Sequence, residues 1–519
     1  MPTITIDPIT RIEGHLKIEA VVEEGVVKDA HSSGMLFRGF ELILEGRDPR
    51  DATQITQRVC GVCPIAHATA SSLCLDNAFG ISDKIPDNGR ILRNLILGAN
   101  YIQSHVLHFY HLAALDYVDV TNAADYDGDD PELKSVSNFL ARQHLEPFVP
   151  RYEGDYRLGP ELDRKAVHDY ARALHMRRIA HEMLAVFGGK MPHNCATVVG
   201  GCTQRPTADN MAAFLSRLQE LRQFIDDVYV PDVLAVAAAY PDYFGIGKGC
   251  GRVLAYGVFD AVSQASDARP RECLLPQGAA DESLSIGDFD PKQIAEDVKH
   301  SWYADEMSGK HPSQEETIPD PDKAAGYSWL KSPRYNGQVY EVGPLARMVV
   351  AYLRGMEPVK GIIDNVLGRF KAEPSALFSV LGRHAARAIE TKVVADAMVE
   401  WITQLKPGEP AWAECEIPDE AEGVGLTDAP RGAVGHWIKI SGKRIKRYQL
   451  VVPTTWNASP RDDKDQPGPV EQSLIGTPIK DAENPFELVR IVRAYDPCLA
   501  CSVHLVSPKG RSLAKFRIG

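Results

Sequence analysis

The chain has 519 residues, enough for two to four domains or for one large unit, and 44% of them are hydrophobic, which is ample for a buried core. It carries 57 basic and 70 acidic side chains, a formal net charge of −13, and its basic residues are scattered. This balance argues against nucleic acid as a partner. No apolar run approaches the roughly 20 residues that span a bilayer. The N-terminus also lacks the pattern of a secretory signal, so we expect a chain that is soluble by itself, and its location stays open.

The predicted elements begin with a pair of strands. Residues 3–30 alternate apolar and polar side chains around Glu23-Glu24-Gly25, the pattern of a strand pair. Helical periodicity then dominates, and it predicts long helices over Ile91–Tyr117, Arg164–Phe187, Asp209–Ala239, Leu345–Phe370 and Ser375–Leu405. Proline, glycine and charge interrupt this periodicity in three stretches that we predict to be long surface loops, namely Ala123–Gly154, Arg269–Tyr327 and Asn457–Asn484. A second alternating segment, Trp437–Val452, turns at Ser441-Gly442-Lys443.

These patterns together predict an α+β fold that is predominantly α, with a central bundle of long helices and small β elements from the N- and C-terminal regions. Because the β segments come from opposite ends of the chain, we expect one interwoven unit over residues 1–504. Its N-terminal β-containing part covers about residues 1–55, its helical body about 56–425, and its C-terminal β-containing part about 426–504.

The ten cysteines are informative through their spacing. Four of them form two Cys-x-x-Cys pairs, Cys60/Cys63 and Cys498/Cys501. Such a pair aims two thiolates at one metal ion, although a single pair could also be a redox dithiol or chance. Two pairs, the second followed by His504, favour a shared four-thiolate metal site. The other six are isolated: Cys74, Cys195, Cys202, Cys250, Cys273 and Cys415.

The spacing alone leaves the metal open. Four cysteines most often bind structural zinc, whose ligands usually lie within tens of residues of each other. Here hundreds of residues separate the pairs, and ionisable residues flank them: Arg58, His67, Asp496 and His504. Soft thiolates also suit nickel, copper(I) or iron.

Four motifs in this order resemble those of the catalytic large subunit of [NiFe]-hydrogenases: Thr10-Arg-Ile-Glu-Gly-His15, Gln57-Arg-Val-Cys-Gly-Val-Cys-Pro-Ile-Ala-His67, Ala429-Pro-Arg-Gly432 and Asp496-Pro-Cys-Leu-Ala-Cys-Ser-Val-His504. The resemblance runs from residue 3 to the C-terminus and includes Phe37-Arg-Gly-Phe40 and Val452-Pro-Thr-Thr-Trp456. It is greatest for the nickel–iron–selenium branch. Cys498 stands where those enzymes carry selenocysteine, so we predict no selenium chemistry.

The resemblance implies a nickel ion and an iron that carries carbon monoxide and two cyanides. By motif position, Cys60 and Cys498 are the terminal nickel ligands, and Cys63 and Cys501 bridge to iron. The implied reaction is the reversible heterolytic cleavage of dihydrogen into protons and electrons.

Proton transfer is the second implication. Cys498 matches the thiolate that serves as the first base, and Glu13 matches the carboxylate that passes the proton on, which requires hydrogen-bond reach and a suitable pKa. Without the motif, Glu13 would only end a strand in solvent. His67, four residues after Cys63, is expected to hydrogen-bond a bridging thiolate. The histidines at 105, 108 and 111 are interpreted as packing.

Arg431, with Pro430 before it, matches an arginine that lies over the metals. Its guanidinium stays protonated, so we expect it to donate hydrogen bonds to a cyanide and not to act as the resting base. Where several relatives carry a canopy aspartate, this chain has Ser104, which leaves Asp496 as a carboxylate partner. A second cyanide-binding element is expected at Val452, Pro453 and Thr454.

A second, hard metal is also implied. Glu41, the backbone carbonyl of Leu450, and His504 match a magnesium site, since oxygen ligands and retained waters suit that ion. Without the resemblance, Glu41 would be a solvated surface carboxylate. Magnesium and iron both remain open.

Electron transfer requires a partner, because no cysteine cluster remains for an iron–sulfur relay. We therefore expect an obligate iron–sulfur small subunit. A periplasmic location follows if that subunit carries the export signal; membrane association through partners and a cytoplasmic location stay open. Residues 505–519 match a peptide that an endopeptidase removes after nickel-insertion factors have loaded the site, although an ordinary frayed C-terminus is the alternative.

Two other functions compete with this one. A four-cysteine zinc protein would use its metal only to join the ends of the chain. A quinone-module subunit of the respiratory complex I type shares the fold but generally lacks both cysteine pairs, so the pairs argue against it.

Overall fold

A computed structural model describes the chain except residues 1, 143–147, 150, 152 and 503–519, and it leaves out the side chains of Cys501 and Ser502. The predicted N-terminal strand pair is confirmed as β2 (Leu16–Glu23) and β3 (Val26–Gly34). A further strand, β1 (Thr3–Ile6), pairs with β2 on its other side. Glu24 and Gly25 both have positive φ, as a two-residue hairpin turn requires.

A second antiparallel sheet forms near the other end of the chain. The predicted hairpin is confirmed as β14 (Gly432–Ser441) and β15 (Arg444–Val451). Strand β13 (Glu420–Ala429), which the sequence did not indicate, pairs with β14. Helix α3 (Pro64–Ala78) lies across β13, and a Cβ on Gly425 would meet the carbonyl oxygen of Ala70 at 2.0 Å. Glycine is therefore required where the helix backbone touches the strand.

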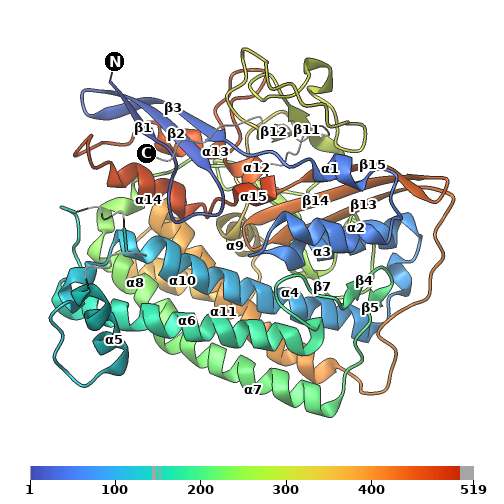
Figure 1. Cartoon of the computed structure of the whole chain (residues 1–519), viewed down its shortest axis with the longest axis horizontal. Coiled ribbons are helices and arrows are strands. Elements are labelled where there is room, and N and C mark those ends of the chain that lie inside the picture. Colours follow the sequence, from blue (N-terminus) through green and yellow to red (C-terminus); the bar gives the residue numbers. More distant parts are fainter. Residues whose placement is uncertain (1, 143–147, 150, 152, 503–519) are drawn as a thin grey trace.

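The predicted helical bundle forms one layer of the molecule (Figure 1). Helix α4 (Asp87–Leu107) packs against α6 (Pro160–Gly188) and α11 (Val380–Gln404), and α6 packs against α7 (Ala208–Phe224). A π-helical turn joins α7 to α8 (Val230–Ala239), and another, His108–Ala113, extends α4. The predominantly α, α+β architecture is thus confirmed.

One segment that was predicted as a single helix forms two helices. The segment Leu345–Phe370 divides into α9 (Pro344–Leu353) and α10 (Val359–Phe370). Gly355 adopts a left-handed φ of 67°, and Pro358 precedes the second helix. Both residues interrupt helical hydrogen bonding, although the apolar periodicity continues across them.

The three predicted surface loops contain regular structure, so this prediction was wrong in part. Asp130 caps α5 (Pro131–Ala141) by accepting a hydrogen bond from Leu133 N at 2.9 Å. Short strands β8 to β11 lie between residues 273 and 297, and α13 (Pro469–Leu474) is largely buried. Prolines at helix starts and strands of two to four residues resemble loop sequence, which explains the error.

Short elements carry the chain between these layers. They include helices α1 (Phe40–Leu44), α2 (Asp51–Thr56), α12 (Pro453–Asn457), α14 (Phe486–Ala494) and α15 (Leu499–Ser502). The short strands are β4 (Thr197–Val198), β5 (Gly201–Cys202), β6 (Val253–Ala255), β7 (Val258–Asp260), β8 (Cys273–Leu275), β9 (Gly278–Ala280), β10 (Ile286–Gly287), β11 (Ile294–Asp297) and β12 (Ser332–Tyr335).

The two ends of the described chain meet. Glu13 and Cys498 form an isolated parallel bridge, and Val27 N donates to Thr477 O at 3.0 Å. Segments far apart in sequence therefore lie side by side above the bundle (Figure 1). The boundaries proposed within residues 1–504 stay predictions.

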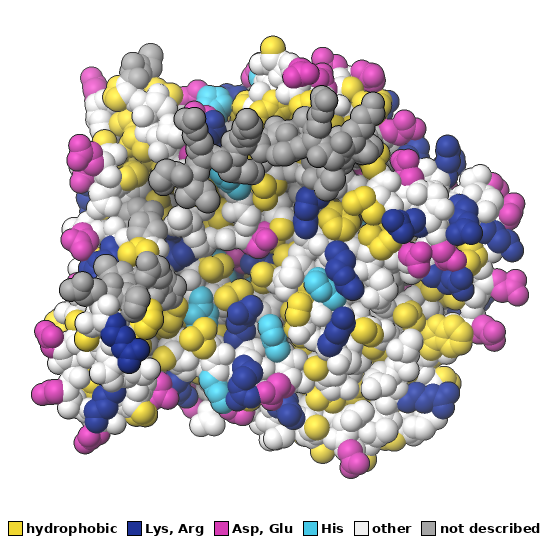
Figure 2. Space-filling model, viewed as in Figure 1, with side chains coloured by type: hydrophobic (Ala, Val, Ile, Leu, Met, Phe, Trp, Pro, Cys, Tyr) yellow, Lys and Arg dark blue, Asp and Glu magenta, His cyan; other side chains and the backbone are white. Residues whose placement is uncertain are grey.

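The surface is uneven in charge. Lys, Arg and His side chains gather in the middle of the face shown in Figure 2, over α6. That helix presents His168, Arg172, His175, Arg178 and His181 at least partly to solvent. Within the part of the chain that is described, no helix is both long and apolar enough to cross a membrane.

Candidate metal centre

Three cysteines from the two Cys-x-x-Cys pairs come together in the interior. The sulfurs of Cys60, Cys63 and Cys498 all lie within 4.8 Å of one another, and those of Cys60 and Cys498 are 3.5 Å apart. Each residue is at most 2% exposed. Metal–thiolate bonds of about 2.3 Å bring sulfurs to such separations, so these three donors fit a shared metal centre. The Cys501 side chain lies outside the described part of the chain, so its place in the set stays a prediction.

Local backbone geometry presents the first pair. A 3₁₀ turn, Gln57–Val59, ends at Cys60, and Cys63 stands directly before α3, whose first residue is Pro64. The amides of Val62 and Cys63 point at Cys60 Sγ, at 3.2 and 3.4 Å. These amide dipoles favour a thiolate at Cys60.

The second pair follows a buried helix. Helix α14 ends at Ala494, and Asp496 turns the chain with a φ of 55° before Pro497 and Cys498. The backbone amide of Cys498 donates to Thr454 Oγ1 at 2.9 Å. Thr454 is 3% exposed and begins the short helix α12 together with Pro453, after Val452. The predicted cyanide-binding element therefore lies against Cys498.

Glu13 reaches the same centre. Its Oε2 accepts a hydrogen bond from Ala500 N at 2.7 Å and lies 3.4 Å from Cys498 Sγ. Burial raises the pKa of this carboxyl, and the neighbouring Cys60 raises it further, while Ala500 N, Cys498 and Arg431 oppose the shift. A carboxyl with a raised pKa next to a thiolate is suited to receiving a proton.

Arg431 approaches from the β13–β14 hairpin, where Pro430 and Arg431 form the turn. Its Nη2 donates to Asp496 Oδ1 at 2.8 Å, and its Nε donates to Asp496 O at 3.0 Å. The contact with Ser104 Oγ is longer, 3.4 Å. Burial disfavours the charged guanidinium, but Asp496 and the cysteine thiolates outweigh burial and raise its pKa. Arg431 is therefore a fixed cation.

A buried hydrogen-bond relay of His67, His436 and Tyr448 was not predicted from the sequence. His67 Nδ1 lies 3.3 Å from His436 Nε2, and His436 Nδ1 lies 2.9 Å from the hydroxyl of Tyr448. Burial lowers the pKa of His67 to about 4, so its ring is neutral at physiological pH. The relay fixes the orientation of His67. The expected hydrogen bond from His67 to a bridging thiolate stays a prediction.

The predicted second metal site is described in part. Glu41 lies on α1, which contacts β15, the strand of Leu450. Glu41 Oε2 is buried and has no hydrogen-bond partner in the described residues. Burial raises the pKa of Glu41, while Lys331 lowers it. His504 lies outside the described residues.

Three further charged residues near Glu41 could not be found from sequence. Lys331 donates to Glu315 at 2.5 Å and reaches Glu296 at 3.5 Å, and all three are buried. Glu296 lies on β11, and Glu315 and Lys331 lie in separate loops, so no recognisable motif joins them. An unpartnered carboxylate oxygen among buried acids fits a hard cation bound by oxygen ligands.

The three spaced histidines bind different partners. His105 contacts Glu390 at 2.8 Å, His108 contacts Arg493 O at 2.7 Å, and His111 contacts Tyr170 O at 3.3 Å. A polar group elsewhere, Asp130, Glu132 and His168, could also gather around an ion, but it lies partly exposed beside α5.

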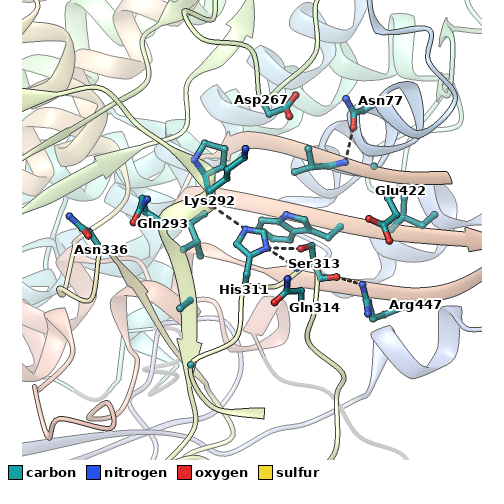
Figure 3. Close-up of a pocket in the computed structure, with 18 of the residues that line it drawn as sticks. Asn77, Asp267, Lys292, Gln293, His311, Ser313, Gln314, Asn336, Glu422 and Arg447 are labelled. Carbon is teal, nitrogen blue, oxygen red and sulfur yellow. Dashed lines mark hydrogen bonds between the residues drawn. The ribbon is translucent and has the colours of Figure 1, made fainter. Parts of the chain in front are cut away.

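Figure 3 shows the lining of a cavity of about 890 Å³, and no cysteine is among its lining residues. It opens between β11 and the β13–β14–β15 sheet, and Trp437 and Arg447 line it. Among its lining groups, His311 Nδ1 lies 2.7 Å from Ser313 Oγ, and none of the predicted site residues lines it. The buried cysteines, flanked by Glu13 and Arg431, instead fit a thiolate-ligated metal centre.

Comparison with known proteins supports this class. Residues 38–504 match the family described as nickel-dependent hydrogenase, and residues 3–33 match one described as HoxL-like. The chain is 45% identical to the periplasmic [NiFeSe] hydrogenase large subunit of Desulfomicrobium baculatum, covering 97% of this chain and 95% of that protein. It is 36% identical to the hydrogenase-2 large chain of Escherichia coli K12, covering 99% of each.

Solved structures of hydrogenases have the same fold as this chain. The Ni-Fe-Se hydrogenase of Desulfovibrio vulgaris Hildenborough in the reduced state has a TM-score of 0.86 and 46% identity, covering 97% of this chain and all of that one. The chain belongs to the nickel-dependent hydrogenase family as a large subunit.

Proposed function

We propose that the protein catalyses the reversible heterolytic cleavage of dihydrogen to protons and electrons. The observation that carries this proposal is the buried cluster of three cysteine sulfurs, one of them 3.4 Å from the Glu13 carboxylate. Cys60, Cys63, Cys498 and Cys501 would hold nickel and an iron with one carbon monoxide and two cyanide ligands. Soft thiolates suit both metals.

Nickel and iron, when bound, supply the redox chemistry that divides dihydrogen. Cys498 Sγ accepts the proton, and Glu13 Oε2 receives it across 3.4 Å. The raised pKa of Glu13 lets the carboxyl hold this proton, and its half-buried position lies between the cysteines and the surface.

Arg431 would orient a ligand of the iron through hydrogen bonds, and it does not accept the proton. Its charge is fixed by Asp496, and its guanidinium offers donors to a cyanide nitrogen from the turn at Pro430. Thr454, with the backbone at Val452 and Pro453, offers the second cyanide-binding element. Thr454 Oγ1 already accepts from Cys498 N, so its hydroxyl proton remains to donate.

A magnesium or iron ion at Glu41, Leu450 and His504 would neutralise the buried acids and stabilise the C-terminal segment. The sequence beyond His504 supplies no ligand. Its removal by an endopeptidase, after nickel-insertion factors act, would let the second cysteine pair close over the metals.

An iron–sulfur small subunit would carry the electrons away. The name of the D. baculatum relative supports a periplasmic location, reached through a signal on the partner. Expression of this chain without that partner is expected to give protein that cannot pass electrons from dihydrogen to a dye. Efficient dye reduction by the isolated chain would contradict an obligate partner.

The decisive experiment is elemental analysis and infrared spectroscopy of the purified complex. Nickel and iron, with one carbonyl and two cyanide stretches, are expected. Zinc alone would instead support a structural four-cysteine site. Intact-mass measurement of active protein tests maturation: a large subunit ending at His504 supports cleavage, whereas full activity with Gly519 retained contradicts it.

A further inference from the structure

Arg38 contacts both halves of the cysteine centre without touching a cysteine side chain in the described contacts. It lies in the loop between β3 and α1, and its Nη2 donates to the carbonyl oxygens of Val59 and Ala500, the latter at 2.5 Å. Val59 directly precedes Cys60, and Ala500 directly precedes Cys501. One guanidinium nitrogen thus joins backbone segments 21 and 462 positions away from Arg38 in the sequence.

Apart from the 3.5 Å approach of the Cys60 and Cys498 sulfurs, the second segment makes its hydrogen bonds to other parts of the chain. Glu13 holds it to the N-terminal region, with Leu499 N donating to Glu13 O at 2.7 Å. Thr454 holds Cys498 N to α12. Arg38 ties this segment to the segment of the first cysteine pair.

We propose that Arg38 is a positioning residue that locks the two cysteine pairs together. This positioning role rests on the proposed function only in one respect, the identity of the metals that the cysteines would hold. Before the second pair docks, Arg38 can already bind the Val59 carbonyl and present its remaining Nη2 proton. Docking of Ala500 O then completes a pair of charge-assisted hydrogen bonds.

The chemistry of this contact requires arginine. Nη2 carries two protons in one plane, which point in different directions and match two separate carbonyls. Nη1 lies 3.4 Å from Arg58 O, and the guanidinium carbon lies 5.0 Å from the centre of the Phe40 ring. The ring and the third carbonyl hold the plane in place. A lysine ammonium, a point charge on a flexible stem, cannot reproduce this geometry.

The test is hydrogen–deuterium exchange of the purified complex with Arg38→Gln, followed by mass spectrometry. The matched control is Arg47→Gln, which removes an exposed arginine nine positions away in the sequence that also donates to a backbone carbonyl, Ile43 O at 2.6 Å. Loss of the lock should accelerate exchange of the amides of residues 498–500 about tenfold, the effect of one lost charged hydrogen bond. Exchange in α4 and α11 should not change.

Arg38→Lys provides the second variant if Arg38→Gln does not accumulate. It keeps the charge and should show intermediate exchange at the same amides. Equal exchange in the Arg38 variant, the Arg47 variant and the wild type would overturn the proposal. Because Arg38 binds backbone, this result is independent of metal identity: zinc in the wild type would refute the proposed reaction but leave the exchange comparison valid.

Discussion

Glu13 and Cys498, 485 positions apart in the sequence, are joined through both backbone and side chain. The Glu13 carboxylate contacts the cysteine sulfur at 3.4 Å and accepts from Ala500 N at 2.7 Å. The residue proposed to carry protons therefore also holds the ligand segment in place. Substitutions at Glu13 must separate these two roles.

Replacement of Glu13 by glutamine separates proton transfer from the structural role of this residue. The amide oxygen can still accept from Ala500 N, so metal content and infrared bands should match the wild type. Because the amide cannot ionise, hydrogen–deuterium isotope exchange and turnover should fall by about a hundredfold or more. Glu19→Gln, which alters a more exposed carboxylate paired with Lys17, is the control. Isotope exchange near the wild-type rate in Glu13→Gln would exclude Glu13 as the proton carrier.

Arg431→Lys should shift the cyanide stretches and lower turnover about tenfold. Lysine keeps the charge but cannot contact both the carboxylate and the carbonyl of Asp496 while also reaching a cyanide. The infrared spectrum of the complex gives the measurement, and Arg444→Lys, at an exposed position of the β14–β15 hairpin, is the control. Unchanged bands would remove the proposed cyanide contact.

Glu41→Gln distinguishes a metal ligand from a merely buried carboxylate. If Glu41 binds the second metal, the variant should lose magnesium or iron in elemental analysis, keep nickel, and melt at a lower temperature. Without a metal there, glutamine would relieve a buried carboxylate with an unpartnered oxygen and would raise the melting temperature. Glu45→Gln, an exposed position one turn later, controls for the loss of charge.

Glu471 should make stability depend on pH. Burial raises its pKa from 4.5 to about 7, although Ser32 N, Tyr327 and Gly468 N oppose the shift. Between these values the unfolded chain releases a proton that the folded chain retains, so stability falls as pH rises from about 4.5 to 7, by about 3 kcal/mol in total.

The measurement for Glu471 is the melting temperature of the wild type and Glu471→Gln between pH 5 and 8. Glutamine places a donor near backbone donors, so the variant should be less stable at every pH. The wild type should nevertheless lose stability relative to the variant as pH rises. Parallel curves would contradict the raised pKa.

Local sequence determined the parts of the site that depend on neighbouring residues. The Cys-x-x-Cys spacing of Cys60 and Cys63 places both sulfurs at one turn, and the hairpin turn at Glu24-Gly25 includes a glycine, which adopts positive φ without steric cost. The bundle helices α6 and α7 were predicted because each buries one face and keeps its 3.6-residue period. Helix α3 was not identified because 14 of its 15 residues are buried, which removes that period.

Only the tertiary structure decided which distant residues meet. Packing brings His67 to His436 and Lys331 to Glu315, and no short motif records these pairs. The joining of both cysteine segments through Arg38 is likewise invisible in the sequence. The physical reason is that sequence patterns encode backbone preference and burial over a few turns, whereas contacts across hundreds of positions are set by how the completed layers pack.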